Sequence, residues 1–385
     1  MKIYLYYLLI LILFINCSKV QDKESISSYD VLENVLSFDI SFGDENIKDE
    51  FLLAKPNGIA VDNDGNIFIA DENKIKVFDV NGKEKGIFGG TGFGPGEFSY
   101  GRSPTISHSN ILTVLDHYGY KVFNLKGELL NEYNFNRISH FKTIEKDNGI
   151  SSLEPIKIIF VKNNLKIMYL AGMKSLPNRS FLNGVHLLIR DNGDSLIILN
   201  QNEETTHFID FNTPSVVLIP FTGNLFYLLL PDSRLLYTFQ SYLKQKVDDY
   251  PSYKINVLSL KNGELKYIRH EYNPIIIPDS LKAPWISSDK PKDLRNFIKN
   301  IHYYPPVQKI FADEDLLFVF MYEKNSENEF LVNIFDLSND KFLKNAYFSV
   351  IPDIIKNKYA YIVIMGENIF PRLERYRIDN LVYEK

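Results

Sequence analysis

The sequence predicts an all-β fold, a six-bladed β-propeller closed by pairing of an N-terminal strand with the C-terminal blade. Three observations support this prediction. The 385 residues are rich in aromatic side chains, with 28 Phe and 24 Tyr, which favours strands. A strand-and-turn pattern recurs along the chain, and its clearest spacing falls within the 40 to 50 residues typical of a propeller blade. Finally, each end of the chain carries part of a sheet that is incomplete by itself.

The first blade is predicted within residues 56–88. Strands are expected at 56–61, 66–70, 74–80 and 84–88, separated by turn sequences such as Asp62-Asn-Asp-Gly65 and Asn81-Gly82. Four antiparallel strands in about 35 residues make one blade. A second copy follows at 104–135, and four pairs of residues in the two copies stand 45 positions apart: Asp71 and Asp116, Lys76 and Lys121, Phe78 and Phe123, Gly82 and Gly127.

Later copies of the third strand and its turn give the blade number. They occur at 185–193, 255–263, 331–339 and 374–380, which brings the total to six blades. The last copy leaves no sequence for a fourth strand, whereas residues 35–42 alternate like a strand without a hairpin partner beside it. We expect this N-terminal strand to complete the last blade, which would remove two exposed sheet edges.

The glycine-rich segment Gly92-Phe-Gly-Pro-Gly-Glu-Phe98, followed by the blade pattern, resembles the NHL-repeat group. It is most similar to the six-bladed β-propeller lipoproteins of bacteria. The resemblance is detailed over residues 56–133 and reduced to a pattern from Phe141 onward. It implies a propeller scaffold without an assigned reaction, although other members of the wider fold group are lyases or lactonases, commonly with a metal in the central channel.

The N-terminus indicates export. Lys2 precedes an unbroken apolar run at 3–15, which is too short for a bilayer-spanning helix and suits a secretory signal. Cys17, the only cysteine, follows directly, and the segment resembles a bacterial lipoprotein signal with Cys17 as the lipidated residue; Asn16 departs from the usual small residue before it. We therefore expect a signal peptide at 1–16, a tether at 17–30 and the propeller at 31–385, anchored to a bacterial membrane on the periplasmic or cell-surface side. Ordinary cleavage, giving a soluble secreted protein, is the alternative.

Local motifs for cofactors, metals and nucleic acids are lacking. With 43 basic and 48 acidic residues, the formal charge of −5 argues against general nucleic-acid binding. The glycines at 89–96 are not followed by Gly-Lys-Ser/Thr, so an inter-blade turn is expected rather than a phosphate cradle. Asp62–Asn66 fits a hairpin better than a calcium loop, because the twelfth position is Asn73. The seven histidines show no metal-ligand spacing, and we predict no cofactor and no metal, while ligands gathered from separate blades stay possible.

Binding residues are expected where the sequence departs from the repeat. An insertion at 278–306 carries the only tryptophan and a helical pattern at 293–303 preceded by Pro291, and we expect it to cover one ring face. Arginine suits carboxylates or phosphates, and aromatic rings suit sugars or peptides. We predict a non-catalytic module that binds a protein, peptide or glycan; the alternative is a metal-dependent lyase or lactonase. The predicted ligand-binding residues are Tyr100, Arg102, His117, Tyr118, Trp285, Tyr303 and Tyr304.

Overall fold

The computed structural model describes residues 31–385 except 45–46, 118, 136–138, 163–164, 178–179, 194, 212, 214 and 242–250. The predicted signal peptide and tether, Cys17 and the predicted binding residue Tyr118 lie outside the described residues.

Six antiparallel sheets follow one another along the chain. The first consists of β2 (Pro56–Val61), β3 (Ile67–Asp71), β4 (Lys74–Phe78) and β5 (Glu84–Gly89), and the second of β6 (Arg102–Ile106), β7 (Ile111–Asp116), β8 (Gly119–Asn124) and β9 (Leu129–Asn134). These strands confirm the predicted first two blades to within two residues at most boundaries.

The third sheet departs from the repeat. It has five strands and longer ones, β10 (Ser151–Lys162), β11 (Leu165–Ser175), β12 (Phe181–Asp191), β13 (Leu196–Asp210) and β14 (Ser215–Leu218). The next two sheets return to four strands. They are β15 (Asn224–Leu229), β16 (Arg234–Gln240), β17 (Ser252–Ser259) and β18 (Leu265–Glu271), then β19 (Val307–Asp313), β20 (Leu316–Lys324), β21 (Phe330–Asp336) and β22 (Lys341–Phe348).

The sixth sheet is built from both ends of the chain. Its strands are β23 (Ile354–Lys356), β24 (Tyr359–Gly366), β25 (Ile369–Ile378) and β1 (Leu36–Phe42), in the order β1-β25-β24-β23. Strand β1 runs antiparallel to β25, with Leu36 opposite Ile378 and Phe42 opposite Leu373. The pairing of the N-terminal strand with the last blade is therefore confirmed. Just before β1, Leu32 also pairs with the outer strand of the fifth sheet at Ala346.

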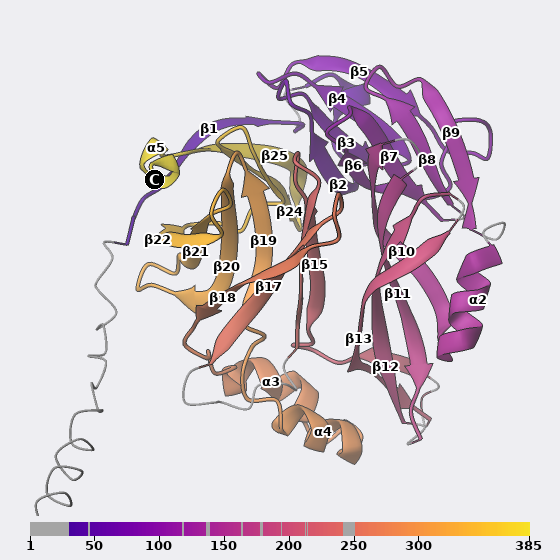
Figure 1. Cartoon of the computed structure of the whole chain (residues 1–385), viewed down its shortest axis with the longest axis vertical. Helices are drawn as coiled ribbons and strands as arrows, with labels where there is room; N and C mark the ends of the chain where they lie inside the picture. The colour runs from indigo at the N-terminus through magenta and orange to yellow at the C-terminus, as the bar shows by residue number, and fades with distance from the viewer. Residues whose placement is uncertain are drawn as a thin grey trace, which may run out of the picture.

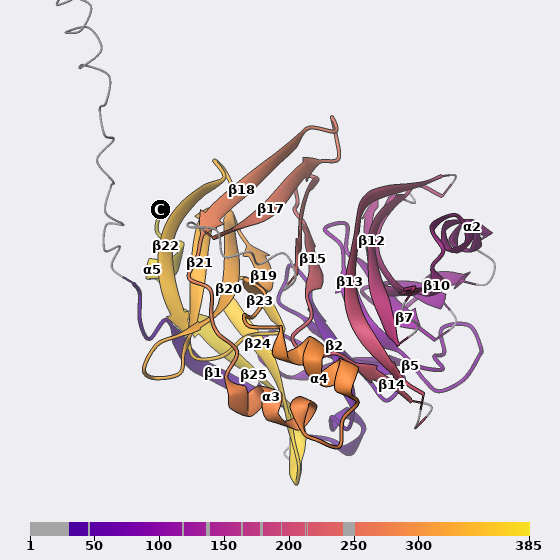
Figure 2. The ribbon, with the colours of Figure 1, turned by 90° about the horizontal axis from the view of Figure 1, so that it is seen from below.

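Buried apolar side chains lie between neighbouring sheets. Each of six clusters joins one sheet to the next, and one of them places Phe78 of the first sheet with Tyr361 of the sixth. Because the sixth sheet packs on the first as well as on the fifth, the sheets form a closed ring. The first strands, including β2, β15 and β19, lie toward its middle, while outer strands such as β5, β18 and β22 lie at its rim (Figures 1 and 2).

Asp71, one of the repeated residues, ties the sheets to the incoming connection. It is fully buried at the end of β3, and its carboxylate accepts hydrogen bonds from the backbone N–H of Ala54 at 3.1 Å and of Lys55 at 2.6 Å. Its second oxygen lies 2.6 Å from Nζ of Lys76. Asp116 does the same for the next connection, accepting from the backbone N–H of Tyr100 at 2.7 Å. The aspartates of the repeat are therefore structural.

The glycine-rich segment is the predicted inter-blade turn. Residues 90–98 fold back through hydrogen bonds between Gly92 N–H and Phe98 C=O at 3.0 Å and between Phe98 N–H and Gly90 C=O at 2.7 Å. Phe98 is fully buried between the first and second sheets. Gly89 has a φ of +84°, and a Cβ there would lie 2.6 Å from the Phe98 ring, so only glycine fits. The Asp62–Asn66 segment is likewise a hairpin turn between β2 and β3, with Asp62 Oδ1 accepting from Asn66 N–H at 2.7 Å.

Helices occur in the connections between sheets. The insertion contains α3 (Asp279–Ile286) and α4 (Lys292–Lys299), and α4 confirms the predicted helix after Pro291, although it ends sooner. Leu294 and Ile298 of α4 pack on Phe208 of β13, so the insertion contacts the third sheet. Figures 1 and 2 show α3 and α4 side by side at one side of the ring. The remaining helices are η1 (Asp49–Phe51), α2 (Ser139–Asn148) beside β10, and α5 (Asn380–Tyr383).

The two ring faces differ in the loops that they carry. Because each four-stranded sheet runs up and down, the connections between sheets and the turns between second and third strands lie on one face, which we term the connection face. It carries the glycine-rich segment and the α3–α4 insertion. The hairpins between first and second strands, such as Asp62–Asn66, lie on the opposite face, termed the turn face.

Candidate functional site: the axial channel

A cavity of about 480 Å³ follows the axis of the ring. It is lined by residues of β2, β6, β10, β15, β19 and β23, the first strand of every sheet, together with Tyr169 of β11 and Asp353, which directly precedes β23. Most lining residues are apolar, and a few polar and charged groups stand among them. This size and composition are those of small-molecule binding sites, which range over about 300 to 1,000 Å³. We term this cavity the axial channel.

Lys157 is a cation inside the channel without an acidic partner among the described residues. It lies on β10, and its Nζ stands 5.1 Å from the ring centre of Tyr227 on β15. Tyr227 in turn donates a hydrogen bond from its hydroxyl to the Lys157 carbonyl at 3.1 Å. Burial, and to a smaller extent the nearby charge of Lys309, lowers the pKa of Lys157 from 10.5 to about 8. At neutral pH the side chain is therefore still largely charged.

Lys309 is the second channel cation. Its Nζ donates to the Pro352 carbonyl at 2.7 Å and lies 3.6 Å from Oδ1 of Asp353. Burial lowers the pKa of Lys309, and the Asp353 carboxylate opposes this shift. Asp353 is itself held by the backbone, because its Oδ2 accepts from Val363 N–H at 2.9 Å.

The charged groups of the channel come from three sheets. Lys157 stands five residues before the end of β10, Lys309 four before the end of β19 and Asp353 three before the end of β23. With Lys356, the lining contains three lysines and one aspartate, a formal charge of +2. In a confined, largely apolar cavity an uncompensated positive charge attracts anions more strongly than it would in open water.

A tyrosine–histidine pair also borders the channel. The hydroxyl of Tyr169 lies 2.6 Å from Nδ1 of His186 and 3.2 Å from Oδ1 of Asn224. Burial lowers the pKa of His186 to about 4 and raises the pKa of Tyr169. Both groups are therefore neutral at pH 7, and the pair joins the third and fourth sheets rather than supplying an acid or base.

The structure places the predicted residues of the second blade near the connection face. Tyr100 is 48% exposed, and Arg102 begins β6, where its Nη2 donates to the Pro155 carbonyl at 3.4 Å. His117 is exposed and its backbone N–H donates to Asp116, the same carboxylate that holds Tyr100. Arg102 thus borders the strand that carries Lys157, whereas the other two lie on loops.

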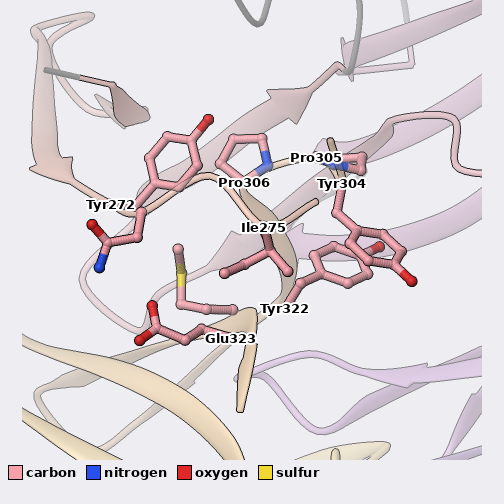
Figure 3. A pocket seen from close by; sticks show the side chains of 9 residues that line it. Tyr272, Ile275, Tyr304, Pro305, Pro306, Tyr322 and Glu323 are labelled. Carbon is pink, nitrogen blue, oxygen red and sulfur yellow. The ribbon is translucent and has the colours of Figure 1, made fainter. Parts of the chain in front are cut away.

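The predicted residues of the insertion form a separate group. Trp285 is half-buried on α3 against the insertion core, and Tyr303 pairs with Ile276 where the insertion begins and ends. The Tyr304 ring stacks on Tyr322 of β20, with centroids 4.4 Å apart at 9°. Figure 3 shows these two rings side by side in a small pocket with Ile275, Pro305, Pro306 and Glu323.

This pocket does not accept a ligand. Its volume is about 10 Å³, room for about one water molecule. Burial raises the pKa of Glu323, the one acidic group of the lining, and also the pKa of Tyr304. The Tyr304 side chain therefore serves to pack the insertion on the fifth sheet.

The connection face also exposes apolar side chains in three places. They lie on the glycine-rich connection, on the insertion and around the β24–β25 turn: Phe93, Tyr100, Ile276, Leu281, Met365, Ile369 and Phe370. Exposed apolar side chains can form interaction surfaces, and others lie elsewhere on the ring, such as Leu265 and Tyr267 on the outer strand β18.

The channel does not fit a metal ion. Among the described residues, no three His, Cys, Asp or Glu side chains gather into a possible metal site. In the axial channel the single carboxylate stands beside lysines, which would repel a cation. The described residues therefore do not fit the metal that the lyase or lactonase alternative would require.

The comparisons with known proteins support the fold. A family described as 6-bladed beta-propeller matches residues 17–165, which include the first two sheets and β10 but less than half of the chain. That match agrees with the six sheets seen here. The fold is a six-bladed β-propeller. No curated protein matches the chain.

Several solved structures resemble the chain weakly. A candidate exported protein from Bacteroides fragilis is 14% identical, with 91% of this chain and 99% of that chain covered at a TM-score of 0.44. A gluconolactonase from Xanthomonas campestris is 10% identical, with coverages of 85% and 86% and a TM-score of 0.40. A Bacteroides caccae protein of unknown function is 14% identical, with coverages of 76% and 81% and a TM-score of 0.34. Similarities this low assign no activity to this chain.

Sequence reasoning missed the channel lysines. Both stand beside apolar residues in first strands, Lys157 within Ile156-Lys-Ile-Ile-Phe160 and Lys309 within Val307-Gln-Lys-Ile-Phe311. Each strand also carries other charged residues, such as Glu154 in β10 and Asp313 in β19, so the sequence alone did not single out these lysines. None of the helices in the described part of the chain has the length and apolar character needed to cross a bilayer.

Proposed function

We propose that this protein is a non-catalytic, extracytoplasmic binding lipoprotein that recognises a peptide, protein or glycan on its connection face. In this proposal one group of the ligand enters the axial channel, and the rest lies across the exposed apolar side chains around the mouth. The observation that carries the proposal is the channel of about 480 Å³, lined by the first strand of every sheet. A largely apolar cavity with a few polar groups favours binding.

The channel chemistry favours binding over catalysis. Lys157 and Lys309 have lowered pKa values, but Asp353 is the one carboxylate among the described lining residues, and His186 reaches the channel only through its hydrogen bond to Tyr169. Asp353 is engaged by Lys309 and by the backbone of Val363. The metal-dependent alternative gains no specific observation from these residues.

A channel-blocking variant tests this function. The purified chain would be screened on peptide and glycan arrays, and each hit remeasured with Ala312→Phe, which places a bulky ring in the channel wall. Lys266→Phe adds the same ring on the outer strand β18, where the side chain is exposed. We expect Ala312→Phe to lose the hits and Lys266→Phe to keep them. Hits that tolerate the blocked channel, or an absence of hits, would contradict the proposal.

Anchoring has a separate test. Lipidation of Cys17 is proposed from the apolar run that precedes it in the sequence. Several acyl chains would hold the protein firmly on a membrane, because each buried CH₂ contributes about 0.8 kcal/mol. Cys17→Ala should therefore move the protein from the membrane fraction to the soluble fraction. An unchanged distribution would remove the anchor from the proposal and leave the binding function untouched.

A further inference from the structure

We infer that the axial channel binds a small organic anion, with Lys157 and Lys309 holding a carboxylate or phosphate group and the apolar walls contacting the rest of the ligand. This inference rests on the proposed function, because it names the chemical class of the group that enters the channel.

The first step of the argument is the state of Lys157. Its ammonium group has no ion pair or hydrogen bond among the described residues, and its one assigned contact is the face of the Tyr227 ring at 5.1 Å. The Lys157 side chain is half-buried in the channel, and a charge that has lost part of its contact with water is costly unless a partner compensates it. An anionic ligand would supply the missing partner.

The second step is the arrangement of the neighbouring charges. Lys157 and Lys309 line the same cavity, and the charge of Lys309 is near enough to lower the pKa of Lys157, so the channel holds two like charges near each other. Asp353 lies 3.6 Å from Lys309 and compensates only that lysine. Lys356 adds a further positive charge to the lining. Two ammonium groups, one on the third sheet and one on the fifth, can bind one carboxylate or phosphate between them.

The third step is the character of the walls. Ile106, Ile159, Phe226, Leu228 and Ile354 belong to the lining, are partly exposed and present apolar surface from four of the six sheets. A fully hydrated ion such as chloride would leave this surface in contact with water. An organic anion that carries an apolar body satisfies both the lysines and the walls.

Aromatic anions are suitable probes. Binding of benzoate and of phenyl phosphate to the full chain would be measured by isothermal titration calorimetry at pH 7, with benzamide as the neutral counterpart of benzoate. We expect at least one anion to bind at least tenfold more tightly than benzamide, and the stronger anion identifies the carboxylate or the phosphate as the preferred group. Equal binding of benzamide and the anions would overturn the anion assignment and leave a neutral ligand for the channel. No binding of either anion at concentrations up to about 10 mM would also overturn it.

Matched variants locate the site. Lys157→Gln and Lys309→Gln remove one charge each with little change in size, and Lys266→Gln removes an exposed lysine on β18. We expect each channel variant to weaken anion binding at least tenfold, Lys266→Gln to leave it unchanged, and Lys157→Arg to retain most of it. Circular dichroism would establish that each variant is folded. Loss of binding in Lys266→Gln, or unchanged binding in both channel variants, would overturn the inference.

Binding should also depend on pH in a defined direction. Lys157 loses its proton in the free protein near pH 8, so anion affinity should be constant below this pH and fall above it. The Lys157→Gln variant should show a smaller decline between pH 7 and 9, because Lys309, whose pKa burial also lowers, is then the remaining lysine that binds the anion. A decline of the same size in the variant would show that another group is responsible and would count against Lys157.

Discussion

Replacing Lys157 by methionine should stabilise the fold while it weakens anion binding. In the folded protein the pKa of Lys157 lies at about 8, against 10.5 for an ordinary lysine. At about 1.4 kcal/mol per pH unit, this difference corresponds to about 3 kcal/mol of destabilisation by the charged side chain. Water in the channel screens part of that cost, so we expect Lys157→Met to raise the free energy of unfolding by about 1 to 3 kcal/mol at pH 7.

The destabilisation caused by the charged Lys157 side chain should decrease as the pH rises. Below pH 8 the lysine is protonated in both the folded and the unfolded state, so the full cost is present. Between pH 8 and 10.5 the folded protein releases the proton first, and the cost disappears as the pH rises. The stability gap between Lys157→Met and the wild type should therefore be large at pH 7 and small at pH 10.

Urea unfolding followed by circular dichroism at both pH values measures this gap. Lys266→Met serves as the control, because Lys266 is exposed and its replacement should change stability by less than about 0.5 kcal/mol. A Lys157→Met variant that is less stable than the wild type at pH 7, or a gap that is the same at both pH values, would refute the account of Lys157 as a costly buried charge.

Three further predictions concern the ring. Asp71→Asn removes the carboxylate that lies 2.6 Å from the buried Lys76 ammonium group. This change should lower the free energy of unfolding, measured by urea titration, by about 3 to 5 kcal/mol. A loss below about 1 kcal/mol would contradict the structural role given to the Asp71–Lys76 pair. Phe98→Ala empties the space between the first two sheets and should cost about 3 to 5 kcal/mol by the same assay, whereas exposed Phe93→Ala should cost little. Deleting residues 36–42 exposes the edge of β25, so size-exclusion chromatography should show oligomers in place of monomer, and an unchanged monomer peak would count against closure by β1.

The sequence was most informative where the repeat is regular. The first two blades could be predicted because Asp71 and Asp116 each end a second strand and bind the next connection, which keeps their spacing constant. The closing strand could be predicted because residues 35–42 had no local partner. These features depend on short-range hydrogen bonding and on strand alternation, both of which are visible in a single sequence.

The third sheet and the channel could not be predicted in the same way. Strands β10 to β13 are longer than the repeat and gain β14, and α2 lies in a stretch for which no element was predicted. Lys157 and Lys309 come from sheets that are separated by a whole blade, so only the closed ring brings their charges into one channel. Among the predicted binding residues, Arg102 borders the strand that carries Lys157, while Tyr304 packs the insertion on β20.

The pairing of Leu36 with Ile378 also means that the ring can close only after β25 has been synthesised. When β25 leaves the ribosome, β1 has long been synthesised, yet its partner has only just appeared. The entropic cost of joining such distant segments rises only slowly with their separation, so the late closure is thermodynamically tolerable. Until then, a nascent molecule with five finished sheets presents a bare edge to its surroundings. A chaperone that protects this protein during folding would therefore be needed most until β1 has paired with β25.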